Sequence, residues 1–159
     1  MKRMGAVLLA ALACVLLLSA CSGQDSKAVW TLESGEEILS SGAFSETLEE
    51  LDMDTTWMLY KLGESGLDRS ALTDGLCRRS AGATCEELAV LIFDGPESAQ
   101  TALASLQSYL EGQISANQDY RPGEIPKLEG AWLEQRGNTL LMAVANDLEA
   151  AKAAVGEGG

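Results

Sequence analysis

ELAVLIF, at residues 87–93, is the stretch of sequence that decides the fold. Six apolar residues follow Glu87 without interruption, and such a run is typical of a strand in the centre of a sheet. Residues 71–79 form a weaker strand candidate, and the two segments flank the turn-forming sequence SAGAT. We therefore expect residues 87–93 to be a central strand, paired with residues 71–79.

A second strand pair is predicted near the C-terminus. Residues 131–136 and 139–146 flank Gly137-Asn138, a two-residue connection of the kind that favours the primed hairpin turns. A short helix should follow this hairpin, because Asp147 can cap its start and Gly156 can stop it.

Helical patterns surround the strand pairs. Residues 96–118 place apolar side chains at spacings of three and four, which predicts a helix of about six turns, although Gly112 lowers its stability by about 1 kcal/mol. Residues 119–130 carry two of the three prolines and are expected to form an extended connection. Earlier in the chain, Ser34 is the expected N-cap of a short helix, and residues 45–66 are expected to be helical with a break around residues 52–55.

This order of elements predicts an α+β fold. We expect an antiparallel or mixed four-stranded sheet made of two hairpin-like pairs. A long central helix and short terminal helices should pack on it, mainly on one face. The order of the strands stays open, and a split pairing around the long helix is one alternative.

The N-terminus has the architecture of a bacterial secretion signal. Two basic residues precede an uncharged run at residues 4–20, and small residues lie directly before a cysteine. The end of this pattern resembles the lipobox, in which a signal peptidase cleaves ahead of a lipid-modified cysteine: Leu18, Ser19, Ala20 and Cys21. We predict that Cys21 carries a lipid anchor. The alternative is an uncleaved transmembrane anchor, since about 17 apolar residues are at the short limit for spanning a bilayer.

The predicted processing divides the chain into four parts. Residues 1–20 are the signal peptide, and residues 21–33 are the lipidated cysteine and a flexible tether. Residues 34–155 form a single α+β domain, and residues 156–159 form a disordered tail. The domain should therefore be held at the cell membrane, on its extracytoplasmic side.

Charge and composition exclude several classes of function. Loss of Lys2 and Arg3 with the signal leaves 9 basic against 24 acidic residues, a net charge of −15. This excess of acid argues against binding nucleic acid or anionic lipid through a basic surface. Histidine is absent, which excludes Ser-His-Asp and Cys-His mechanisms and His-ligated metal sites. Because no glycine-rich nucleotide motif is present either, we expect no cofactor.

The exported part resembles a family of small bacterial lipoproteins catalogued as domain of unknown function 4358. The matching stretches are LSSGAFSETLEELD, SAGATCEELAVLIFDGPESAQTAL, YRPGEIPKLEGAWLEQRGNTLLMAVAND and EAAKAAV. They cover most of residues 38–155, and the likeness lies in the order and character of the segments. The resemblance implies a lipid-anchored extracytoplasmic protein to which no activity is assigned.

Four groups of residues are candidate sites. Asp52-Met53-Asp54 begins like a calcium loop but lacks its glycine and third ligand, so a solvated turn is the simpler interpretation. Paired carboxylates suit acid-base chemistry on sugars, although neighbours in sequence point to different sides: Glu49 with Glu50, and Glu86 with Glu87. Aromatic rings suit a ligand platform, but more often anchor a core: Trp57, Tyr60, Tyr120 and Trp132.

The fourth group is Cys77 and Cys85, the two thiols that remain once Cys14 leaves with the signal and Cys21 is acylated. An oxidising exterior favours a disulfide between them. A hairpin centred near Gly82 would place them diagonally, about 7 Å apart, at the limit for a bridge. Two small buried thiols are the alternative.

These observations favour a non-enzymatic binding or interaction domain of the cell envelope, with a protein or small molecule as partner. We predict no catalytic or metal-binding residues. The alternative is a carboxylate-dependent hydrolase that acts on envelope or extracellular substrates, which would require two acids converging in a pocket. A thiol redox protein that uses Cys77 and Cys85 ranks last, because their spacing differs from C-x-x-C.

Overall fold

A five-stranded antiparallel sheet, in the order β1-β2-β3-β5-β4, forms the middle layer of the protein in the computed structural model, which describes residues 27–158. The strands are β1 (Glu49–Leu51), β2 (Leu72–Arg79), β3 (Glu87–Phe93), β4 (Trp132–Arg136) and β5 (Thr139–Val144). The α-helices are α1 (Leu32–Ser40), α2 (Met53–Leu59), α3 (Pro96–Asn117), α4 (Ile125–Glu129) and α5 (Leu148–Ala154). Short 3-10 helices are η1 (Leu62–Ser65), η2 (Arg69–Ala71) and η3 (Pro122–Glu124). The α+β class and the long helix are confirmed, but the sheet has five strands where four were predicted.

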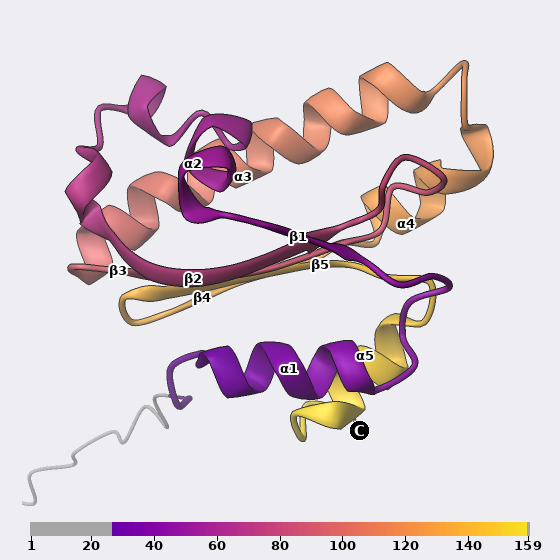
Figure 1. Ribbon diagram of the computed structural model, residues 1–159, viewed down its shortest axis with the longest axis horizontal. Helices are drawn as coiled ribbons and strands as arrows, with labels where there is room; N and C mark the ends of the chain where they lie inside the picture. Colours follow the sequence, from indigo (N-terminus) through magenta and orange to yellow (C-terminus); the bar gives the residue numbers. More distant parts are fainter. Residues whose placement is uncertain (1–26, 159) are drawn as a thin grey trace, which may run out of the picture.

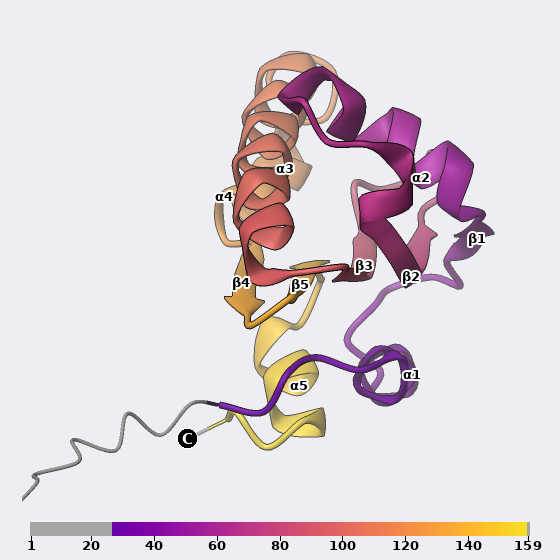
Figure 2. The ribbon, with the colours of Figure 1, turned by 90° about the vertical axis from the view of Figure 1, so that its left-hand side faces the viewer.

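Helices cover both faces of the sheet (Figures 1 and 2). Successive residues of β3 alternate between two cores: Ala89 and Leu91 belong to the core beneath α3, and Leu88 and Val90 to the core beneath α1 and α5. The prediction that helices pack mainly on one face is therefore wrong. The physical reason lies in the central strands, which are apolar at odd and even positions alike and need cover on both sides.

The fifth strand, β1, lies at the edge of the sheet, in a segment that we expected to be helical. Leu51 pairs with Cys77, and Glu50 pairs with Arg78, with which it also forms an ion pair of 3.1 Å. Only three residues pair, so the segment is too short to show strand periodicity. Pairing with β2 outweighs the helix preference of its glutamates.

The N-terminal boundary of the fold lies earlier than predicted. α1 begins at Leu32, and Thr31, in place of Ser34, is its N-cap in a reciprocal capping box. Trp30 is buried, and its indole nitrogen donates to the Glu134 carbonyl. Residues from Trp30 onward thus belong to the folded domain and not to the tether.

The connection after α3 also differs from its prediction. Residues 119–130 contain η3 and α4, where an extended segment was expected. Pro122 and Pro126 each lie in the first turn of one of these helices, where a missing amide hydrogen leaves no bond unmade.

Three predicted elements are confirmed. α3 spans Pro96–Asn117, β4 and β5 form a hairpin around Gly137-Asn138, and the Asp147 side chain caps α5 by accepting from the Ala150 amide. Gly137 has a positive φ of 56° at this turn. Within residues 27–158, no helix combines the length and the hydropathy that crossing a membrane requires.

Candidate functional site

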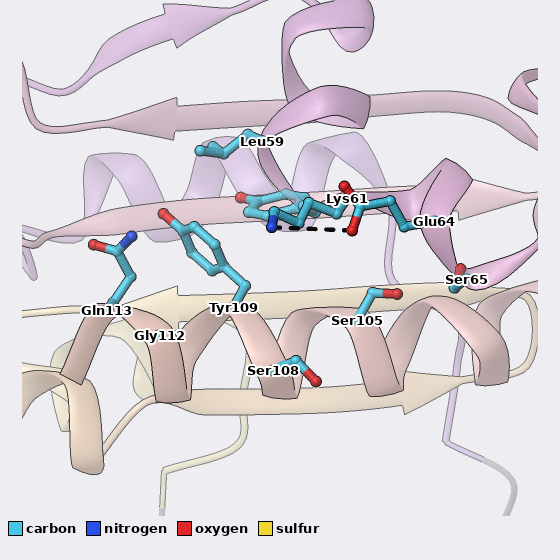
Figure 3. Close-up of a pocket in the computed structure, with 10 residues that line it drawn as sticks. Leu59, Lys61, Glu64, Ser65, Ser105, Ser108, Tyr109, Gly112 and Gln113 are labelled. Carbon is cyan, nitrogen blue, oxygen red and sulfur yellow. Dashed lines mark ion pairs between the residues drawn. The ribbon is translucent and has the colours of Figure 1, made fainter. Parts of the chain in front are cut away.

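A groove of about 580 Å³ runs between the α2–η1 segment and α3 (Figure 3). Other hollows on the described residues hold about 300 Å³ or less. One wall of the groove carries Leu59, Tyr60, Lys61, Glu64 and Ser65, and the other carries Ser105, Ser108, Tyr109, Gly112 and Gln113. The groove is the most promising site for a ligand, because small-molecule sites are concavities of about 300–1,000 Å³.

The α3 wall follows from the helical repeat. Its lining residues recur three or four positions apart, so they share one stripe of the helix. This stripe runs beside the buried one, which holds Ala99, Ala102, Leu106 and Leu110. The sequence shows both stripes, but only the fold brings residues 59–65 against the outer one.

Lys61 marks the rim of the opposite wall. With φ 54° and ψ 37°, it is the single non-glycine residue with positive φ among those that the structure describes. This left-handed conformation turns the chain from α2 into η1 and is unfavourable for a residue with a Cβ. The Lys61 ammonium lies 3.9 Å from the Glu64 carboxylate, and both side chains are largely exposed, so the pair is loose.

Beneath the groove, the carboxylate of Glu87 joins the two walls. The Tyr60 hydroxyl, at the end of α2, donates to Glu87 Oε1, and the Tyr109 hydroxyl, from α3, donates to Oε2 at 2.7 Å. The two tyrosine rings pack edge to face with centroids 5.0 Å apart. The side chain of Glu87 is 4% exposed, and Arg79 Nε lies 3.7 Å from Oε2.

The surroundings of Glu87 disfavour charge. Burial raises the pKa of Glu87, while hydrogen bonds from Tyr60 and Tyr109 and the charge of Arg79 lower it. Burial, followed by the charge of Glu87, raises the pKa of both tyrosines, which therefore act as hydrogen-bond donors. The same two causes raise the pKa of Cys77, whose sulfur lies 3.3 Å from the Tyr60 hydroxyl, to about 11.

The acid pairs that the sequence suggested do not converge. Glu86 is buried on the side opposite to Glu87, where its carboxylate accepts from the Ser45 amide and hydroxyl and from Lys127 at 2.8 Å. These bonds tie the loop after α1 and helix α4 to the end of the sheet. Glu49 and Glu50 are exposed on the edge strand β1. Neither pair faces a common cavity.

The two cysteines are free thiols and lie apart. Cys77 pairs with Ala89 across β2 and β3, and Glu87 pairs with Arg79, so Cys85 lies four residues beyond the partner of Cys77. Four residues of extended chain span about 13 Å, whereas a disulfide needs Cα atoms within about 7 Å. The structure contradicts the predicted disulfide, because the hairpin turn is centred later than Gly82.

The predicted aromatic platform is not assembled. Trp57 packs against the core with Arg69 5.7 Å from its ring centre, Trp132 packs on Trp30, and Tyr120 is exposed. Only Tyr60 reaches the groove, where it meets Tyr109, a residue that the sequence reasoning missed. The stripe of small and polar residues that surrounds Tyr109 on α3 was the available signal.

The Asp52-Met53-Asp54 segment starts a helix. Asp52 is the N-cap of α2 and accepts from the amides of Asp54 and Thr55, and Asp54 forms an ion pair with Arg69. In the described part of the chain, no three Cys, Asp or Glu side chains are grouped so that they could hold a metal ion.

No protein-family model, no curated protein and no solved structure matches this chain. The resemblance to the lipoprotein family therefore stays a prediction. The predicted peptidase and lipid-attachment residues Leu18, Ser19, Ala20 and Cys21 lie outside the described residues.

Proposed function

We propose that this protein is a lipid-anchored binding protein of the cell envelope, without catalytic activity, which holds a small ligand in the groove between α2–η1 and α3. The secretion signal and the lipobox-like sequence ending at Cys21 support anchoring on the extracytoplasmic side. The groove supports the binding function.

The groove carries the proposal because its walls are fixed before any ligand arrives. Tyr60 and Tyr109 come from opposite walls, and both donate to the same buried carboxylate of Glu87. Among the described residues, no buried side-chain nitrogen or oxygen lacks a hydrogen-bond partner. A site of this kind binds with little loss of conformational entropy.

Two residues of the groove are unfavourable for folding alone. Lys61 holds a left-handed backbone conformation, and Gly112 interrupts the middle of α3 although a Cβ there would meet nothing within 4 Å. Residues that lower stability without a packing reason are typical of functional sites. Both lie on the groove.

A carboxylate-dependent hydrolase is less well supported. Such an enzyme needs two acids on either side of the bond to be cleaved. Of the described residues that line the groove, Glu64 alone carries a carboxylate, and it pairs with Lys61. Glu87 lies beneath the groove, with both oxygens engaged by phenols. Binding is therefore the better-supported function.

The test is a titration of the full-length protein, labelled with ¹⁵N and held in detergent, against four small probes. These are N,N′-diacetylchitobiose, L-alanine, glycine betaine and adenosine monophosphate. We expect at least one probe to cause saturable shifts in the amide signals of residues 105–113. If no probe shifts those signals, the groove is not a small-ligand site.

Two tryptophan variants supply the control. Ser108 lines the groove, and Ser115 is exposed on the same helix away from the lining. Ser108→Trp should abolish binding of the active probe, and Ser115→Trp should leave it unchanged. Equal effects of the two variants would contradict binding in the groove.

A further inference from the structure

We propose that the ligand of the groove is a neutral saccharide. The proposal rests on the binding function proposed above and names its ligand class. Four features carry it: the charge balance of the groove, the kind of hydrogen-bonding groups on its walls, the fixed ring of Tyr109 and the space above Gly112.

The groove has no unbalanced charge to offer a ligand. Lys61 and Glu64 are its ionisable rim residues, and their charges face each other at 3.9 Å. The exported chain around them carries a net charge of −15, which repels anions over long range. An anionic ligand would therefore be disfavoured outside the groove and uncompensated within it.

The polar groups on the walls suit hydroxyl groups. Both walls are helical, so their backbone amides and carbonyls are largely engaged in helix hydrogen bonds, and recognition depends on side chains. Ser65, Ser105, Ser108 and Gln113 each offer donors and acceptors. Sugar hydroxyls also donate and accept at once, whereas extended peptides are usually bound along an open strand edge.

Tyr109 provides a fixed aromatic surface for the apolar face of a sugar ring. Its hydroxyl is anchored on Glu87, its ring is held edge to face against Tyr60, and the residue is half-buried. Figure 3 shows the ring standing on α3, between Gln113 and the Lys61 side chain. An aromatic face with an apolar body and a fixed polar end is suited to stacking on a pyranose.

Gly112 lowers the surface of α3 beside this ring. A Cβ at this position would meet no atom within 4 Å, so nothing in the described fold requires glycine. The absence of a side chain lets a ligand approach the helix backbone closely. A methyl group here should obstruct a flat ring that lies across Tyr109.

The experiment compares Gly112→Ala with Ser115→Ala in the full-length protein in detergent. Both changes raise helix propensity on α3, but only Gly112 lines the groove. With N,N′-diacetylchitobiose and cellobiose as probes, we expect saturable shifts at Ser105, Ser108 and Gly112. We also expect affinity to fall at least about tenfold in Gly112→Ala while its melting temperature rises. Ser115→Ala should keep the wild-type affinity.

The outcomes separate the two proposals. If both saccharides fail while L-alanine or glycine betaine binds at residues 105–113, the saccharide class is wrong and the groove remains a binding site. If Gly112→Ala binds the saccharides as tightly as the wild type, the placement on α3 is wrong. If no probe binds at these residues, both the saccharide and the small-ligand function are overturned.

Discussion

At the scale of single residues, Glu87 is the side chain on which the groove most depends. It ends the loop between β2 and β3, and it is the first residue of the central strand. Its carboxylate collects hydroxyls from two helical segments that share no other buried polar partner among the described residues. The cost of burying the carboxyl is offset by these bonds and by Arg79.

The first prediction concerns the pH dependence of stability. Burial raises the pKa of Glu87 above its usual value of 4.5, so the folded state holds the proton more tightly than the unfolded chain. The stability that Glu87 contributes is therefore fully present below pH 4.5 and is lost as pH rises through the folded-state pKa. Glu87→Gln removes this loss, so the variant should gain free energy of unfolding relative to the wild type as pH rises above 4.5. Urea denaturation between pH 4 and 8 measures the difference.

Two results bear on this prediction. Glu87→Ala should lower the free energy of unfolding by about 3 kcal/mol, because it leaves the buried Tyr60 hydroxyl without its carboxylate acceptor. If the wild type gains stability relative to Glu87→Gln as pH rises, then Glu87 has a lowered pKa and the burial argument fails.

The second prediction concerns the two free cysteines. Cys77 is fully buried with a pKa of about 11, whereas Cys85 is half-buried and has a pKa raised less strongly by burial. Iodoacetamide at pH 8 should therefore modify Cys85 slowly in the native protein and leave Cys77 unmodified. After denaturation without reductant, both should be alkylated. Protection of both residues in the denatured protein would show a disulfide and contradict the β2–β3 register.

At the scale of elements, a glycine on β2 determines how closely α2 packs on the sheet. A Cβ on Gly75 would lie 2.7 Å from Met53 Sδ and 2.9 Å from the Val90 carbonyl oxygen. The carbonyl belongs to the central strand and cannot move without breaking the ladder. Gly75 therefore has a packing role that Gly112 lacks.

The third prediction uses this contrast between two glycines. Gly75→Ala should lower the free energy of unfolding by about 2 kcal/mol, because it overpacks the contact between α2 and the sheet. Gly112→Ala should raise it by up to about 1 kcal/mol through helix propensity. Guanidinium denaturation of both variants provides the comparison. Equal shifts in the same direction would contradict the packing described for β2.

Most elements could be predicted from local patterns, and the exceptions have a common cause. The long helix α3, the β4–β5 hairpin and the Asp147 cap each depend on side chains close in sequence. Strand β1 depends on partners in β2, and α1 begins at Leu32 because Trp30 is buried against β4 and β5. Contacts between distant segments decide these boundaries, and a single sequence does not show them.

The groove shows the same limit. Its α3 stripe was readable as small and polar residues at helical spacing, and Tyr60 was noted as an aromatic candidate. The meeting of Tyr60 with Tyr109 over Glu87 was not predictable, because it joins three elements separated by 22 residues or more. The pairing of Glu86 and Glu87 in sequence suggested one acidic site, but alternation along the strand sends them to opposite faces.

At the scale of the whole molecule, the chain enters the fold on the side opposite to the groove. Lys27 forms ion pairs with Glu134 and Glu157, and Arg136 lies 3.5 Å from the centre of the Trp30 ring. These contacts hold the entering chain beside the α1 and α5 layer, whereas the groove lies in the α2 and α3 layer (Figures 1 and 2). With an anchor at Cys21, six residues would separate the lipid from Lys27, a reach of at most about 21 Å. The groove would then face away from the membrane.

The mass of the mature protein tests the central claim of anchored, extracytoplasmic binding most directly. The protein should be extracted from the membrane fraction and its N-terminal peptide analysed by mass spectrometry. We expect a chain that begins at Cys21 and carries at least two acyl chains, because one chain alone gives only marginal membrane binding. A main species that retains Met1 and carries no lipid would contradict the claim.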